Sequence, residues 1–405
     1  MLNEFRFSWV RRDLDFPEND PKSPTATISG LFSVGGATNF PQYRITDTFQ
    51  FSDMLTWTRG RHTLKFGTDI RYNKVDNGSA FNSKGAFTFN NLEAFINNFA
   101  ASYTQALQVA SFETDQWQNA WYVQDDFRIT PDLTVNLGLR YELSTVPLGM
   151  FGATDAESLA ALVPGAVKKD TNNWAPRVGF AWSPRSQNRL LGDGLTVFRG
   201  GFGLGYDVLF YNLLTVNASN YPRIATLTQA NVADLYPNIV SGGASPVFNA
   251  LNTWVNSAQD TENPDSRFYS LSMQRQVGLY VFEVGYSGSR GYKGINQVEM
   301  NPAILTDAQA ATVRATLNPA SIPGFQARRM IPQFGSRVTI PAYVGPGGND
   351  VEARSDYNAV YVSANRRFAN GLQFGGSYTH SRWDSNNDAS PGESGTDAAT
   401  QRAQD

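Results

Sequence analysis

The 405-residue sequence contains no cysteine and only two histidines, His62 and His380. Disulfides and thiolate ligands are excluded, and two distant histidines leave almost no material for a zinc site or a serine–histidine–aspartate triad. Charged residues make up 17% of the chain, against roughly 25% in an average globular protein. This profile suits a chain that faces lipid and crosses an oxidising compartment. The net charge of -3 shows no basic excess, so nucleic acid is not expected as a partner.

Long hydrophobic runs are also missing. No stretch approaches the roughly 18 consecutive apolar residues of a transmembrane helix, so any membrane crossing has to be made by strands. The first twelve residues, MLNEFRFSWVRR, lack a basic segment followed by an apolar one and do not predict a signal peptide. They are typical of a strand that is already under way.

What the sequence does contain is alternation of apolar and polar residues with a period of two. In 133–143, leucine, valine and tyrosine alternate with threonine, asparagine, glycine, arginine and glutamate, and 62–72 and 279–287 follow the same pattern. Eleven strands are predicted on this basis: 2–11, 45–57, 62–72, 116–129, 132–143, 174–183, 195–206, 267–277, 279–289, 357–368 and 372–382. A twelfth, 25–34, has a weaker pattern. The lengths match the nine to eleven or so residues that cross a bilayer at a tilt, rather than the shorter strands of soluble proteins.

The connections between these strands alternate between short and long. Short turns are predicted at Arg59-Gly60, Thr130-Pro131, Val277-Gly278 and Ala369-Asn370-Gly371, with a moderate one near 184–194. Long segments lie between the hairpins, at 73–115, 144–173, 207–266 and 290–356. Outer-membrane barrels have short periplasmic turns and long extracellular loops. The sequence therefore predicts an all-β fold, an antiparallel transmembrane β-barrel in the bacterial outer membrane.

The orientation of the strands predicts only part of a barrel. With periplasmic short turns, strand 2–11 runs outward and a periplasmic connection precedes Met1, while strand 372–382 also runs outward without a returning strand. About eleven or twelve strands arranged in this way do not close a barrel. We therefore expect residues 1–405 to be a partial barrel domain, a fragment without plug domain, signal peptide or closing strand.

Two acidic residues and six tryptophans test this topology. Asp53 and Asp125 fall on the apolar faces of their strands, but each lies within about five residues of a short turn, where the cost of a charge at the membrane interface is small. Tryptophans lie toward predicted strand ends, as in an interfacial aromatic girdle, at positions 9, 57, 117, 121, 174 and 182. The alternative is that they fill the core of a soluble sandwich.

Several phrases resemble one family, the Oar-like TonB-dependent outer-membrane receptors. They follow one another in the expected order across nearly the whole chain: MLTWTRGRHTLKFG (54–67), WYVQDDFRITPDLTVNLGLRYE (121–142), NNWAPRVGFAWSP (172–184), GDGLTVFRGGFGLGYD (192–207), FYSLSMQRQVG (268–278), VFEVGYSGSRG (281–291) and YNAVYVSANRRFANGLQFGGSYTHS (357–381). The resemblance implies a barrel of about 22 strands. It also implies an N-terminal plug and a TonB-type energy coupler that acts through the N-terminal part. This sequence shows no plug, no coupler-binding box and no final strand with an aromatic carboxyl terminus.

Three motifs have a plain structural interpretation. Gly201, Gly203 and Gly205 resemble a phosphate-binding loop, but they lie inside a predicted strand, where glycines ease curvature or leave space in the lumen. Asp384, Asn386 and Asp388 have the rhythm of a calcium loop, but Ala389 and Gly395 stand where the motif needs glycine and glutamate. His62 is expected at the interface and His380 near an outer strand end.

Polar residues on the predicted lumen faces are the candidates for contact with a substrate or a plug: Lys65, Asp69, Arg71, Asp126, Arg128, Arg140, Glu142 and Arg177. The favoured interpretation is that they form cross-strand ion pairs. Segment 92–110 has helical spacing at Leu92, Phe95, Ile96 and Phe99, which predicts a short helix folded over its own loop.

The leading functional hypothesis is that the chain is the barrel portion of a TonB-dependent transporter for energised uptake of a small nutrient, a saccharide, peptide or metal chelate. The alternative is a passive porin or a surface-binding, adhesive barrel whose long loops do the work. Enzymatic activity is not expected, because no nucleophile–base set or carboxylate pair stands out. We predict no catalytic residue, cofactor or metal site, assign no ligand-binding residue, and expect outer-membrane lipid, the coupler and a nutrient as partners.

Overall fold

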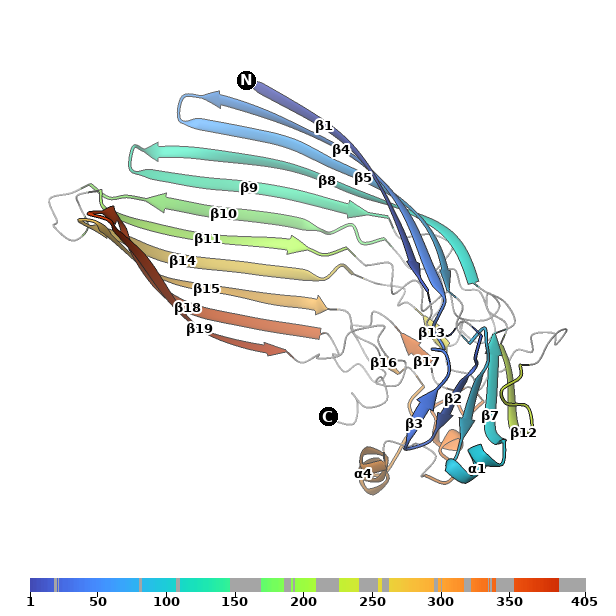
Figure 1. Ribbon diagram of the computed structural model, residues 1–405. Helices are drawn as coiled ribbons and strands as arrows, with labels where there is room; N and C mark the ends of the chain where they lie inside the picture. Colours follow the sequence, from blue (N-terminus) through green and yellow to red (C-terminus); the bar gives the residue numbers. More distant parts are fainter. Residues whose placement is uncertain are drawn as a thin grey trace.

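The computed structural model describes residues 1–17, 20, 22–79, 82–106, 110–145, 169–185, 191, 194–208, 226–239, 254–256, 262–294, 298–299, 301–316, 322–333, 335, 337–339 and 353–385. Its main element is a curved eleven-stranded sheet (Figure 1). In spatial order the strands are β1 (Leu2–Phe16), β4 (Gln42–Arg59), β5 (His62–Ser79), β8 (Ala110–Thr130), β9 (Leu133–Ser144), β10 (Trp174–Trp182), β11 (Thr196–Tyr206), β14 (Asp265–Val277), β15 (Tyr280–Gly294), β18 (Ala353–Ala369) and β19 (Leu372–Ser385).

All neighbouring strands in this sheet are antiparallel, and each of the eleven predicted strands is present. The tight turns at Gly60, Gly278 and Gly371 all have positive φ, a conformation that glycine adopts without steric cost. β1 and β19 lie at the two edges and are not paired with each other in the described part of the chain. The all-β, antiparallel prediction and the partial barrel shape are therefore confirmed.

The register keeps apolar side chains together on one face of the sheet. Val123 lies opposite Leu139, and Leu137 lies opposite both Asp125 and Val178 on its two neighbouring strands. Leu137 is 50% exposed and Val178 is 47% exposed, although both are aliphatic and lie in the middle of long strands. We call this side of the sheet the apolar face. Exposing so many apolar side chains to water is unfavourable, whereas contact with lipid is not.

Aromatic rings cross the apolar face in rows near its two ends. On the long-loop side, the rings of Trp9, Phe49, Tyr72 and Trp117 follow one another across four strands, with centroid separations of 6.2, 6.3 and 4.7 Å. A second row joins Trp121, Tyr141 and Trp174 at 6.2 and 4.5 Å. On the short-turn side, Trp182 contacts Phe198 at 5.7 Å, and Trp57 lies near the Arg59-Gly60 turn.

These rows match the two aromatic girdles of a membrane barrel. Trp182 follows Trp174 by eight positions on β10, which corresponds to a band about 20 Å high for a strand tilted by about 40°. All six tryptophans are exposed, by 39% to 57%, so they do not fill a sandwich core.

Asp53 and Asp125, the two acidic residues that test the topology, have polar partners close to the short turns. Asp125 Oδ2 lies 2.7 Å from His62 Nδ1, and the His62 ring stacks on Phe127 at 4.2 Å. Asp53 accepts a hydrogen bond of 3.1 Å from the Asn3 side chain. Placement near the interface, where water is within reach, fits the low cost expected of these charges.

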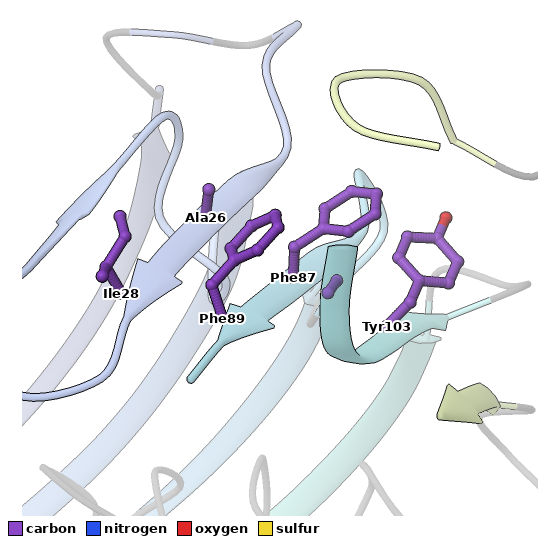
Figure 2. Packing of buried hydrophobic residues seen from close by; sticks show 6 residues of the cluster. Ala26, Ile28, Phe87, Phe89 and Tyr103 are labelled. Carbon is purple, nitrogen blue, oxygen red and sulfur yellow. The ribbon is translucent and has the colours of Figure 1, made fainter. Parts of the chain in front are cut away.

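Three of the long connections meet in a second, smaller sheet at the long-loop end of the large one (Figure 1). Its strands run in the order β12 (Thr226–Ala233), β7 (Phe99–Ala106), β6 (Ala86–Phe89), β2 (Thr25–Ile28) and β3 (Phe32–Val34), with helix α1 (Leu92–Ile96) beside them. We call this unit the loop subdomain. Its core consists of Ala26, Ile28, Phe87, Phe89, Ala100 and Tyr103, all nearly inaccessible to solvent (Figure 2).

The loop subdomain corrects one prediction and resolves another. Among its described residues, segment 92–110 is helical only over Leu92–Ile96, where the Asn91 side chain accepts a hydrogen bond from Ala94 N. From Phe99 the chain is a strand, because Ala100 and Tyr103 enter the shared core and pairing with β6 and β12 outweighs the helical spacing. The weak strand at 25–34 is a hairpin, β2 and β3, which lies in this sheet and not in the large one.

The remaining described elements are short. β13 (Trp254–Asn256), β17 (Arg337–Thr339) and β16 (Val298–Glu299) form a three-stranded sheet, and α4 (Asp307–Thr316) and the 3-10 helix η2 (Gln326–Arg328) belong to the connection between β15 and β18. Within the described ranges, no helix has the length and apolar character needed to cross a membrane.

Candidate functional site

The face of the large sheet opposite the apolar face carries the predicted candidate residues, and we call it the polar face. At its best-connected point, Asp126 of β8 accepts three hydrogen bonds. Lys65 Nζ donates to Oδ2 at 2.9 Å, and the side-chain amides of Gln124 and Asn136 donate to Oδ1 at 2.8 and 2.6 Å. The carboxylate therefore links β5, β8 and β9, and its lone pairs are committed to this structural role.

Two further pairs from the candidate set are also ion-paired. Arg71 Nε lies 3.1 Å from Asp69 Oδ1, and Arg140 Nε lies 2.5 Å from Glu142 Oε1. Asp69 additionally accepts a hydrogen bond of 2.6 Å from Gln50. The expectation of ion pairs holds for six of the eight candidates, but only Lys65–Asp126 crosses between strands. The other two pairs join residues two apart on one strand, because alternate residues share a face.

Arg177 of β10 differs from these candidates. No carboxylate or hydrogen-bond acceptor within the described ranges lies at bonding distance from its guanidinium. Its direct neighbours on the adjacent strands are both glycines, Gly138 on β9 and Gly203 on β11. A Cβ added to Gly203 would lie 3.5 Å from Arg177 Cγ, so the absent side chain leaves room beside the arginine.

A hollow of about 460 Å³ opens on the polar face beside Arg177. Two adjacent rows of the sheet form it. One row runs from Arg177 through Gly203, Phe268 and Ser289 to Tyr357, and the other runs through Gly201, Ser270 and Ser287. The sequence patterns singled out Arg177 and the glycines but not Phe268, Tyr357 or the serines. Their spacing carries no signal until the strand register brings five strands together.

Farther along the polar face, charged groups have neutral partners. Arg199 donates a hydrogen bond of 2.8 Å to Gln274 Oε1, and the Tyr361 hydroxyl donates one of 3.1 Å to Glu283. Arg128, at the short-turn end of β8, has no side-chain partner in the described part of the chain and is exposed. Among the described residues, Arg177 is therefore a cation that has no acceptor and also lines a hollow.

The three motifs behave as their structural interpretations require where they are described. The three glycines at 201, 203 and 205 lie inside β11, which ends at Tyr206. The described residues that follow Tyr206 do not form the helix that a phosphate-binding loop would need. Asp384 belongs to β19 and is paired with Arg382 at 2.7 Å, whereas Asn386 and Asp388 lie outside the described residues.

The two histidines are not brought together. His62 lies on β5, third in the strand order, and His380 lies on β19, the eleventh, opposite Val360. Across the residues that the structure describes, no three His, Cys, Asp or Glu side chains are arranged to hold a metal ion.

Comparison with known proteins places the chain by its fold. Residues 6–405 match the family described as the outer membrane beta barrel domain. The outer membrane transporter YddB from Escherichia coli is similar over 95% of this chain and 40% of its own, with 9% identity and a TM-score of 0.53. The FrpB iron transporter from Neisseria meningitidis (F3-3 variant) covers 87% of this chain and 37% of its own, at 12% identity and a TM-score of 0.44. The ferripyoverdine receptor of the outer membrane of Pseudomonas aeruginosa is similar over 95% of this chain and 38% of its own. The sequence identity is 11% and the TM-score is 0.45.

The chain therefore spans about two fifths of the length of these solved structures. No curated protein sequence matches it.

Proposed function

Because the chain belongs to the family of outer membrane beta-barrel domains, and so to the bacterial outer membrane, we propose that it forms part of the wall of an Oar-like, TonB-dependent transporter. The observation that carries this proposal is the polar face, which extends across eleven strands without the sheet closing in the described part of the chain. Barrels of about eight strands are filled by their own side chains, whereas much wider ones leave a lumen or enclose a plug. A wide, polar lumen is what a transported solute requires.

Transport is also the activity that the chemistry of the polar face supports best. Asp126, Asp69 and Glu142 are all held in ion pairs and are poorly suited to proton transfer. We propose that the plug, the coupler-binding segment and the remaining strands of the barrel belong to the transporter outside residues 1–405. The nutrient, a saccharide, peptide or metal chelate, would enter past the loop subdomain and along the polar face.

The proposal is tested by energised uptake. A strain that lacks the gene and a strain that lacks the energy coupler are grown on defined saccharides, peptides and iron chelates, each supplied at limiting concentration. We expect both strains to lose growth on the same nutrient, and a proton-motive-force uncoupler to stop its uptake in the parent.

Uptake that depends on the gene but not on the coupler would contradict the proposal and show a passive porin. Loss of surface attachment with unchanged uptake would show an adhesive barrel. Both results are read in the same two strains, so the alternatives are separated directly.

A further inference from the structure

Building on the proposed transport function, we propose that the hollow beside Arg177 is a binding subsite for an oxyanion, a carboxylate or phosphate group carried by a hydroxylated solute. The first argument is charge. Arginine stays protonated at all physiological pH values, and its planar fork matches two oxygens of a carboxylate or phosphate. Arg177 is the guanidinium in this hollow, and no described residue neutralises it.

The second argument is the contrast with the rest of the polar face. Elsewhere on the same face, Lys65, Arg71 and Arg140 each have a carboxylate at 2.5 to 3.1 Å. On these strands the sheet supplies a carboxylate for each of these cations, whereas Arg199 bonds the neutral Gln274 and Arg128 lies exposed at the short-turn end, outside this hollow. Arg177 instead has glycine on both neighbouring strands, which leaves its guanidinium accessible from the lumen.

The third argument is the lining of the hollow. Ser270 and Ser287 face each other across β14 and β15, and Ser289 lies between Phe268 and Tyr357 in the neighbouring row. Hydroxyl groups both donate and accept hydrogen bonds, and aromatic rings offer a flat surface to the apolar side of a sugar-like ring. These groups are suited to the neutral, hydroxylated body of a solute whose anionic group is held by Arg177.

The size and position of the hollow agree with a small solute. Its volume of about 460 Å³ lies within the range of roughly 300–1,000 Å³ that is typical of small-molecule sites. Arg177 is near the long-loop end of β10, and Phe268 and Tyr357 are near the corresponding ends of their strands. A solute arriving from outside would therefore meet this subsite in the outer half of the lumen.

The experiment uses the full-length transporter, purified in detergent, and isothermal titration calorimetry with three probes: citrate, glucose 6-phosphate and uncharged glucose. Arg177→Gln removes the charge, and Arg177→Lys keeps the charge but loses the fork. Arg128→Gln is the matched control, because Arg128 is also a polar-face arginine with no side-chain partner among the described residues but lies at the short-turn end. Heat-modifiable mobility on gels verifies that each variant is folded.

We expect the parent and Arg128→Gln to bind at least one of the two anions roughly tenfold or more tightly than glucose. This is the range of a charge-assisted hydrogen bond. Arg177→Gln should remove that preference and Arg177→Lys should keep part of it. The preference should also weaken as salt is raised.

Two results would overturn the subsite. One is a parent protein that binds neither anion more tightly than glucose, and the other is an Arg177→Gln variant that keeps the preference. If Arg177→Gln leaves anion binding unchanged but accelerates protease cleavage of the plug, the arginine pairs with a carboxylate of the plug. Anion preference in a protein whose uptake does not need the coupler would reject the energised transporter while retaining the subsite.

Discussion

Replacing Phe87 by alanine should unfold the loop subdomain while leaving the large sheet intact. Phe87 is 1% exposed, and its ring lies 4.6 Å from that of Tyr103, 5.4 Å from that of Tyr236 and 6.3 Å from that of Phe89. Figure 2 shows its position within the cluster. Removing a fully buried phenylalanine costs about 3–5 kcal/mol. In the described part of the chain this core has six fully buried residues, so neighbouring side chains can do little to fill the cavity.

Phe32→Ala provides the matched control for this experiment. Phe32 belongs to β3 of the same small sheet, but its side chain is 52% exposed. Replacing Phe32 by alanine should lower the free energy of unfolding of the loop subdomain by less than about 1 kcal/mol, as is usual for surface substitutions. The difference between the two variants, about 3 kcal/mol, corresponds to roughly a hundredfold change in the equilibrium for local opening.

Amide hydrogen exchange of the full-length protein measures that opening. Peptides from β6 and β7 should exchange about a hundred times faster in Phe87→Ala than in Phe32→Ala, whereas peptides from β9 should be unchanged in both. Equal protection of β6 and β7 in the two variants would refute an independent core shared by three loops. Faster exchange of β9 in Phe87→Ala would refute its separation from the large sheet.

Two further predictions concern the large sheet. Val178→Arg, on the apolar face midway between Trp174 and Trp182, should cost about 2–4 kcal/mol, whereas Gly179→Arg on the polar face should cost much less. Urea unfolding in lipid vesicles measures both, and equal costs would mean that the faces are wrongly assigned. Asp126→Leu should destabilise the protein by about 1–3 kcal/mol, because Lys65 and two amides lose their acceptor. Lys65→Met in the same chain should restore at least half of that loss, and a double-mutant cycle without coupling would contradict the network.

The large sheet could be predicted from the sequence because lipid requires alternation. A strand between lipid and a wet lumen must place every second side chain on the apolar face, and segments such as 133–143 show this directly. The observed strands nevertheless extend past the predictions. β5 was expected to end at residue 72 and continues to Ser79, because Asn73, Lys74, Asp76 and Asn77 remain paired beyond the aromatic rows. Beyond the aromatic rows most side chains of β5 are polar, with Val75 as the exception, so the alternation ends although the hydrogen bonding does not.

The loop subdomain could not be predicted in this way. Its strands have three to eight residues and come from connections far apart in the sequence. Ala100 and Tyr103 have a spacing that would also fit one face of a helix. The segment forms a strand because it pairs with β6 on one side and β12 on the other. Contacts between segments that are distant in the sequence determine the secondary structure of this region. A local sequence pattern carries no information about such contacts.

The candidate site was predicted only in part for a similar reason. Arg177 was among the predicted lumen residues, but nothing in the sequence separated it from Arg71 or Arg140, whose partners lie two residues away on the same strand. Phe268, Ser289 and Tyr357 join Arg177 through register alone. Alternation assigns a residue to a face, whereas the pairing of strands determines its neighbours on that face.

The loop subdomain also limits how this surface can change during evolution. Loops of a scaffold usually accept insertions and substitutions one at a time, because each is anchored only at its own ends. Here the strands at Thr25–Ile28, Ala86–Phe89 and Thr226–Ala233 belong to three connections but to one sheet. A change in one of them has to be matched in the other two. Grafting the exterior of this protein onto another barrel would therefore require all three loops to be transferred as a set.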